Sequence, residues 1–330
     1  MFFQDILGNE RVKKTLRKAL QKKKVPNSSL FSGPEGVGKR EMALVLAKAM
    51  NCQRKKDDAC GICPPCKAIN AGNFPDVMEI QPEGNVIKIE RIRELRRIAY
   101  LKPMAGGRRI FIINEAEKMT EEAANSLLKI LEEPPLFTYI ILLTHNPFLI
   151  MPTIKSRCQI LSFTPVSREE IKNLLIENGY KQEKASIISL YVRGNTRLAL
   201  SLEWEEIQTR RKQGWELFSS LLKRENFAYF LRNYASYYRN IVREEWIEIL
   251  EILSSFCRDA ILLKEKGDLN LLMNPDYEGE IRNVEPSISC EWLMDCLRKI
   301  DEAIYGFQKN LNVNLLVSSF FANFKEWEYA

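Results

Sequence analysis

The chain has 330 residues, of which 45% are hydrophobic and 28% charged, and its formal net charge is +6 at pH 7. It is long enough for about two or three domains, and its composition is that of a globular protein. The mild positive charge permits contact with nucleic acid without requiring it. No apolar run approaches the ~18 residues of a membrane span, and the first residues lack the regions of a signal peptide. We therefore expect a cytoplasmic protein that does not enter a membrane.

Two stretches with helical periodicity carry many Lys and Arg residues. The first lies within residues 1–24 and the second covers 88–101. Each has an apolar face and a basic face, which is typical of an amphipathic helix with its charges in solvent. Contact of these basic faces with nucleic acid is the alternative interpretation.

The stretch from Gly33 to Arg40 has the spacing G-x-x-x-x-G-K of a phosphate-binding loop. It lies between a short apolar strand, 29–32, and a helix, 40–50, whose positive end would face an anion. An ordinary glycine-rich turn is the alternative. With ATP or ADP as the ligand, the loop predicts contacts from Gly33, Gly36, Gly38, Lys39 and Arg40.

Both positions expected to bind magnesium are altered. Arg40 stands where the loop needs Ser or Thr, and a guanidinium has no lone pair for a metal. The buried strand 110–113 is followed by Asn114 in place of Asp, and an amide is a poorer ligand for a hard cation. Glu115 then occupies the position of the water-activating carboxylate. Because both changes affect one ion, Mg²⁺ binding is doubtful and Glu115 is interpreted as a vestigial catalytic base.

Four cysteines occur within fifteen residues, at Cys52, Cys60, Cys63 and Cys66. This spacing matches a closed tetrahedral zinc site, and the lack of a His or carboxylate ligand in the segment indicates a structural rather than catalytic metal. Four reduced cysteines and an iron–sulfur cluster are the alternatives.

The remaining strands are predicted at 76–80, 139–144 and 160–163, and a helix at 120–133 begins at Thr120. Strands that alternate with helices indicate a parallel α/β sheet with ligand sites at the carboxyl ends of the strands. Thr144 ends one strand there. Its hydroxyl has two equally favoured interpretations, a nucleotide-sensing group or a plain strand-end residue.

From Ser167 onward the pattern is helical, apart from 267–286, which is rich in Asn, Pro and Gly and predicts a loop. We expect an α/β domain at 1–164 that includes the cysteine segment 52–66, a small helical lid at 165–205 and a helical domain at 206–330. An aromatic stripe in the last domain favours core packing over base stacking, and it consists of Tyr229, Phe230, Tyr234, Tyr237 and Tyr238.

Several of these stretches together resemble the clamp-loader subunits of bacterial DNA polymerase III, within the AAA+ class. They are residues 6–10, the glycine-rich loop, the cysteine segment, 125–135 and Ser156-Arg157-Cys158. The resemblance covers 1–205 well and the remainder only by its helical character. It implies an AAA+ parallel sheet with helices on both faces, a helical lid and a C-terminal helical collar that mediates oligomerisation.

The resemblance also implies roles and partners. Arg157 would be an arginine finger acting in trans on a neighbour's ATP, and Arg197 would correspond to the family's second sensor arginine. The partners would be gamma/tau and delta subunits in a heteropentameric ring, the sliding clamp and primed DNA. The departures at Arg40 and Asn114 resemble the delta-prime, or stator, type of subunit, which contributes little or no hydrolysis of its own.

Two other functions remain open. An active, gamma/tau-like motor subunit would show Mg²⁺-dependent ATP turnover by the purified chain. A DNA-binding zinc protein with a relict loop would bind DNA tightly and with a strong dependence on salt.

Overall fold

The computed structural model describes residues 1–55, 57–105, 107–222, 243–284, 286, 288–309 and 311–322, with Glu244 and Gln308 described without side chains. The chain divides into two compact units, Met1–Ser201 and Leu202–Ala330. The separation of a 165–205 lid from 1–164 stays a prediction. The aromatic stripe from Tyr229 to Tyr238 lies outside the described residues.

The first unit contains a five-stranded sheet in which all pairs are parallel, in the order β2-β3-β4-β1-β5. The strands are β1 Ser28–Ser32, β2 Val77–Ile80, β3 Arg109–Ile113, β4 Thr138–Thr144 and β5 Gln159–Ser162. Each bound lies within one residue of the sequence-based expectation, so the predicted α/β sheet is confirmed.

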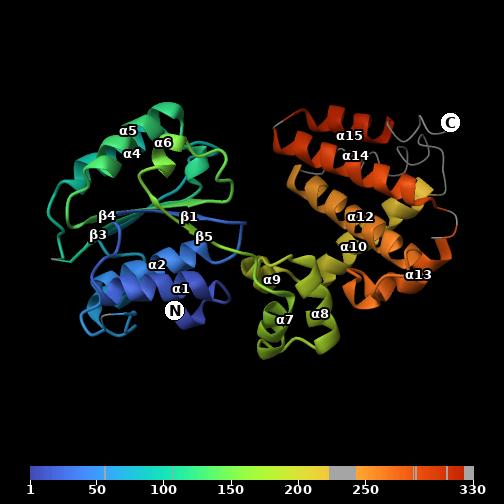
Figure 1. Cartoon of the computed structure of the whole chain (residues 1–330), viewed down its shortest axis with the longest axis horizontal. Coiled ribbons are helices and arrows are strands. Elements are labelled where there is room, and N and C mark those ends of the chain that lie inside the picture. Colours follow the sequence, from blue (N-terminus) through green and yellow to red (C-terminus); the bar gives the residue numbers. More distant parts are fainter. Residues whose placement is uncertain are drawn as a thin grey trace. The chain divides into compact units, whose positions relative to one another are not determined.

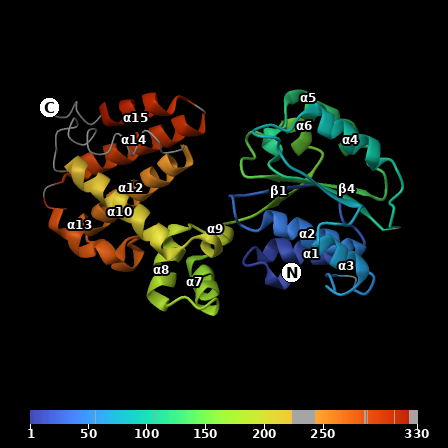
Figure 2. The same ribbon diagram turned by 180° about the vertical axis from the view of Figure 1, so that it is seen from behind.

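Helices cover both faces of this sheet (Figures 1 and 2). One face packs against α1 (Glu10–Gln21) and α2 (Lys39–Asn51) in a core that includes Phe31 and Ile112. The other face packs against α4 (Ile89–Ala99), α5 (Glu121–Glu132) and α6 (Pro152–Lys155) around Leu30 and Phe111. Because neighbouring residues of a strand point to opposite faces, these continuous apolar strands supply both cores.

Shorter elements complete the first unit. A 3₁₀ turn, η1 (Phe3–Asp5), opens the chain, α3 (Pro64–Asn70) follows the cysteines, and η2 (Ala116–Lys118) follows β3. The Thr120 cap of α5 is confirmed, since its side chain accepts a hydrogen bond from the Ala123 N–H at 3.3 Å. The unit ends with α7 (Arg168–Glu177), α8 (Gln182–Tyr191) and α9 (Thr196–Ser201).

The second unit is helical throughout its described residues. Its elements are α10 Trp204–Leu222, α12 Arg243–Lys264, η3 Leu269–Leu271, η4 Pro275–Tyr277, α13 Glu278–Val284, α14 Cys290–Gln308 and α15 Val313–Ala322. The expectation of a loop over 267–286 was wrong for its second half, which forms η4 and α13. Among the residues that the structure describes, no helix is long and apolar enough to cross a membrane.

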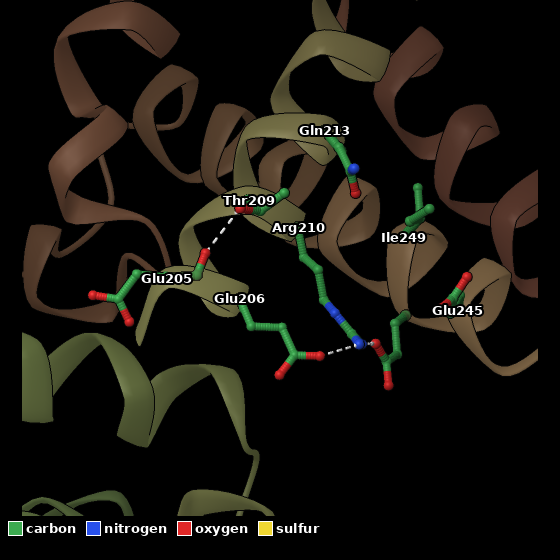
Figure 3. A pocket seen from close by; sticks show the side chains of 8 residues that line it. Glu205, Glu206, Thr209, Arg210, Gln213, Glu245 and Ile249 are labelled. Carbon is green, nitrogen blue, oxygen red and sulfur yellow. Dashed lines mark hydrogen bonds and ion pairs between the residues drawn. The ribbon is translucent and has the colours of Figure 1, made fainter. Parts of the chain in front are cut away.

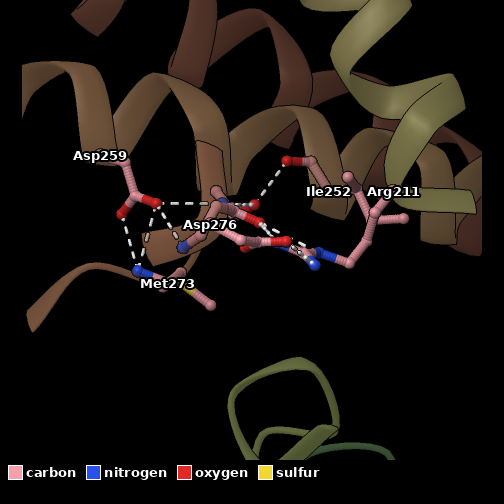
Figure 4. Close-up of polar contacts among 7 residues, drawn as sticks. Arg211, Ile252, Asp259, Met273 and Asp276 are labelled. Carbon is pink, nitrogen blue, oxygen red and sulfur yellow. Dashed lines mark hydrogen bonds and ion pairs between the residues drawn. The ribbon is translucent and has the colours of Figure 1, made fainter. Parts of the chain in front are cut away.

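A buried polar network holds η4 against α10 and α12 (Figure 4). Arg211 of α10 donates to Asp276 at 2.5 and 2.8 Å and to the Asn274 side chain at 3.1 Å. Asn274 in turn donates to Ser255 and Asp259 of α12, and Asp259 also accepts the Met273 N–H. These bonds satisfy the Asn and Asp side chains of a segment whose Asn, Pro and Gly content predicted a loop.

Candidate functional site

The glycine-rich loop joins β1 to α2 in a conformation that requires glycine. Gly36 and Gly38 have φ angles of 69° and 88°, a region where L side chains are strained. A Cβ at Gly36 would also collide with the side chain of Asn195. The loop therefore keeps a tight turn that leads into the first turn of α2, where the helix dipole favours an anion.

The start of α9 is bound to this loop. Thr196 donates from its N–H and its hydroxyl to the Gly36 carbonyl, at 3.1 and 2.9 Å. Asn195 accepts the Leu198 N–H at 2.8 Å and so caps the helix. These contacts bring Arg197, more than 150 residues away in sequence, to the same cavity as the loop.

A cavity of about 460 Å³ lies at this end of the sheet. The structure brings together there most of the nucleotide-site residues predicted from the sequence, namely Gly36, Gly38, Lys39, Arg40, Asn114, Glu115, Thr144 and Arg197. Gly33 is not among its lining residues, but its N–H donates to the Thr144 carbonyl at 3.2 Å. The cavity also includes Glu35, Glu41, Gln81 and His145, so its charges are mixed.

Lys39 lies near the end of the glycine-rich loop, and its side chain reaches back to the start of the loop. Its ammonium donates to the carbonyls of Gly33 and Pro34 at 2.6 and 2.5 Å. Burial lowers its pKa, and the carboxylates of Glu117 and Glu35 oppose that shift. A phosphate entering the loop would therefore compete with two backbone carbonyls for this ammonium.

Arg40 forms a two-point ion pair with Glu79 of β2. Its Nε and Nη2 lie 2.6 and 2.7 Å from the two carboxylate oxygens, and this hydrogen bonding raises the pKa of Arg40. The side-chain amide of Asn114 donates weakly to the same carboxylate at 3.4 Å. Sequence reasoning missed Glu79, because a single Glu near the end of an edge strand carries no motif.

The side chains of Arg40, Glu79 and Asn114 do not form a suitable binding site for a magnesium ion. A guanidinium occupies the helix position from which a hydroxyl would coordinate the metal, and both carboxylate oxygens of Glu79 are bound to it. The positive charge of Arg40 would also repel a divalent cation. The predicted weakness of the metal site therefore has a structural cause that the sequence alone did not give.

The acidic residues after β3 have different surroundings. Glu115 has a φ of 48° and pairs with Lys118 at 2.6 Å. Glu117 has a side chain only 3% exposed and pairs with His145 Nδ1 at 2.5 Å. Burial would raise the pKa of Glu117, but hydrogen bonds from His145 and Thr144 hold it below its ordinary value. Conversely, the hydrogen bond to Glu117 raises the pKa of His145.

Arg157 lies after α6 with about a third of its side chain exposed. Its Nε and Nη2 contact Glu132 of α5 at 2.8 and 2.6 Å, and its Nη1 donates to the Thr153 carbonyl and the Ser156 hydroxyl. All three guanidinium nitrogens are therefore engaged within the chain, on its surface.

The four predicted metal ligands converge. The Sγ atoms of Cys52, Cys60, Cys63 and Cys66 all lie within 4.8 Å of one another. A tetrahedral zinc site with bonds of about 2.3 Å places its sulfurs about 3.8 Å apart, so the cluster fits a structural metal with little movement. Cys63 occupies the position just before α3, whose first turn places Cys66 on the same side.

Backbone groups already support this cysteine cluster. The N–H of Cys63 donates to Cys60 Sγ and that of Lys55 to Cys52 Sγ, each at 3.3 Å. Desolvation would raise the pKa of Cys60, but N–H groups of Ile62 and Cys63 lower it to about 6. Such N–H···S bonds are the second layer that orients thiolate ligands.

A second cavity, of about 350 Å³, lies in the C-terminal unit between α10 and α12 (Figure 3). Arg210 bridges Glu206 and Glu248 there. None of the site residues predicted from the sequence lines it.

The sheet order, the glycine-rich loop after β1 and the helical segments after β5 define an α/β protein of the AAA+ class. A family model described as DNA polymerase III, delta subunit, matches residues 8–167. The delta' subunit of Bacillus subtilis DNA polymerase III is 35% identical over 318 residues, which are 93% of this chain and 93% of that protein. The chain thus belongs to the family of clamp-loader delta' subunits of DNA polymerase III.

Two further comparisons are more limited. The tau subunit of Bacillus subtilis DNA polymerase III is 37% identical over 211 residues, which are 61% of this chain but only 37% of tau. A crystal structure of a gamma subunit-related protein from Thermotoga maritima is 21% identical, with a TM-score of 0.49, and covers 95% of this chain and 98% of that one.

Proposed function

We propose that this chain is the stator-like subunit of a clamp loader, which contributes Arg157 in trans to the ATP site of a neighbouring subunit. The observation that carries the proposal is a contrast between two arginines. Arg40 pairs with Glu79 and occupies the metal position of the chain's own loop. Arg157 lies on the surface outside that cavity, where its partner is Glu132. An arginine finger contributes on the order of 10³–10⁵ in rate and needs no working site in its own chain.

The proposed partners follow from the family. They are gamma/tau and delta subunits in a heteropentameric ring, the sliding clamp and primed DNA, with the helical unit serving as the collar. Because a subunit of the replication machinery acts on the chromosome, we propose that the chain is cytoplasmic.

The proposal includes two bound groups. Zinc would be held by the four cysteines and would fix the 52–66 segment against the N-terminus. ATP or ADP would occupy the glycine-rich loop, with Lys39, Arg197 and Thr144 facing its phosphates. Glu115 would have no catalytic task, because it pairs with Lys118.

The test is a loader reconstituted with Arg157→Ala. We expect clamp-dependent ATP turnover at the neighbouring site to fall on the order of 10³-fold. Arg157→Lys should rescue little, since Lys lacks the planar fork. Arg282→Ala is the matched control, because it removes another exposed arginine paired with a glutamate. Unchanged turnover with Arg157→Ala would refute the stator role, and Mg²⁺-dependent turnover by the lone chain would favour the motor alternative.

A further inference from the structure

The Arg40–Glu79 pair leaves part of the guanidinium available to a ligand. Glu79 accepts from Nε and Nη2, which uses two of the five N–H groups. Among the described residues, none accepts a hydrogen bond from Nη1. Arg40 lines the same cavity as Lys39 and lies one residue after it, in the first turn of α2.

The position of this charge matters more than its size. In a magnesium-using loop, the residue after the lysine holds the cation that neutralises the β- and γ-phosphate oxygens. Here a fixed monovalent cation occupies that position, and Glu79 keeps it from swinging into solvent. A fixed guanidinium binds phosphate oxygens through paired N–H groups. It would thereby neutralise the same oxygens that a directly coordinated metal ion neutralises.

The carboxylates around the cavity limit the affinity that such a site can reach. Glu35, Glu41 and Glu115 face it together with Lys39, Arg40 and Arg197. Glu115 is neutralised by Lys118, and Glu79 is shared with Arg40. A phosphate chain would therefore depend on the three cations and on the loop N–H groups.

We propose that Arg40, held in place by Glu79, replaces the divalent cation, so that the loop binds a nucleoside di- or triphosphate without magnesium. This rests on the proposed role of the loop as a nucleotide site. It extends that role by assigning the ligand as the free nucleotide rather than its magnesium complex.

The test is titration of the purified full-length chain with fluorescently labelled ADP. Metal-free buffer should be prepared with a resin rather than by adding a chelator, because a chelator would also attack a metal held by the cysteines. We expect the apparent Kd for ADP to be at least as high with MgCl₂ as without it, because the cation removes free ADP by forming its magnesium complex. A Kd that falls tenfold or more on adding MgCl₂, or no binding in either buffer, would overturn the inference.

Variants of the pair separate a ligand role from a structural one. Arg40→Ser supplies a hydroxyl and releases Glu79, so affinity without metal should fall at least tenfold and MgCl₂ should restore it. Glu79→Ala removes the group that holds the Arg40 guanidinium in place, so affinity without metal should fall two- to fivefold. A lower thermal midpoint with unchanged affinity in both variants would mean that the pair only braces α2 against β2.

Arg91→Ser is the matched control. Arg91 also pairs with a glutamate, Glu83, at 2.6 Å in the same unit, but it does not line the cavity. The affinity of the Arg91→Ser variant for ADP should equal that of the wild type in both buffers. Failure of this inference leaves the stator role intact, because the Arg157 test reads turnover at another subunit's site.

Discussion

Arg157 and Glu132 form an ion pair that joins the segment after α6 to the last turn of α5. Both side chains are partly exposed, at 34% and 47%. A finger that stabilises a neighbour's transition state must release at least part of this pair. If Arg157 is the finger that we propose, this contact both orients its side chain and competes with the neighbour's phosphate for it.

The first prediction concerns this competition. Glu132→Gln removes the charge but keeps the shape, and an exposed ion pair contributes about 0.2–1 kcal/mol. If Arg157 acts in trans, turnover by the reconstituted loader should rise, by up to about fivefold, as the finger becomes free. The thermal midpoint of the isolated chain should hardly change. Glu278→Gln, which breaks the Arg282 pair, is the control. A large fall in turnover would show that orientation by Glu132 matters more than competition.

The second prediction concerns the cysteine cluster. Elemental analysis of the purified chain should find about one zinc per chain, and Cys66→Ser should remove most of it. Cys158→Ser should retain the metal, because Cys158 lies outside the four-cysteine cluster and packs against the core under α4 to α6. Loss of the metal should also loosen the N-terminus, since Asp58 of this segment accepts the Phe3 N–H and Asp57 pairs with Arg17. Full metal content in Cys66→Ser would contradict the assignment.

Strand positions and cysteine convergence could be predicted because each depends on local pattern and spacing. The carboxyl ends of parallel strands gather automatically, so Asn114 and Thr144 had to lie near the loop. The pairing of Glu79 with Arg40 could not be predicted, because the Arg40 side chain reaches the edge strand only through its length. Neither could the contact of Thr196 with Gly36, which depends on how α7 to α9 fold back onto the loop. Contacts that depend on the reach of a long side chain, or on the packing of segments distant in sequence, become visible only in the tertiary structure.

The third prediction concerns a buried ion pair in the first unit. Asp76 and Arg109 are 0% and 2% exposed and meet at 2.7 Å. Arg109 also donates to the carbonyls of Ile98 and Leu101, so one residue fixes the end of α4. Asp76→Asn leaves this guanidinium without its counter-charge and should lower the free energy of unfolding by about 3–5 kcal/mol. The exposed Asp301→Asn should cost less than about 0.5 kcal/mol. Denaturant titration followed by circular dichroism measures both.

The same pair predicts a dependence on pH. Burial would raise the pKa of Asp76, but the N–H groups of Ala105 and Met104 and the Arg109 guanidinium hold it below its ordinary value. Its contribution is thus complete above the unfolded-state pKa of about 3.9 and is lost as pH falls through the lower folded pKa. The gap in stability between wild type and Asp76→Asn should therefore be full at neutral pH and should shrink below about pH 4. A gap that widens on acidification would contradict this sign.

The last prediction concerns the second unit, where intrinsic fluorescence gives a selective readout. All five tryptophans of the sequence lie there, at Trp204, Trp215, Trp246, Trp292 and Trp327. The rings of Trp215 and Tyr277 pack at a tilt with their centroids 5.5 Å apart, and the Tyr277 ring also faces the Arg211 guanidinium at 5.2 Å. Unfolding of this unit should therefore change tryptophan emission directly.

Asn274 is 3% exposed and bonds to Arg211, Ser255 and Asp259. Asn274→Ala leaves buried polar groups unpaired and should lower the stability of the second unit by about 1–3 kcal/mol. The tryptophan transition should move to lower denaturant, because the lost bonds anchor η4 beside Trp215. Asn314→Ala, at an exposed position of α15, should leave that transition within about 0.5 kcal/mol of wild type. If Asn274→Ala also leaves it there, the network does not hold η4 in place, and the aromatic contacts of Tyr277 must do so instead.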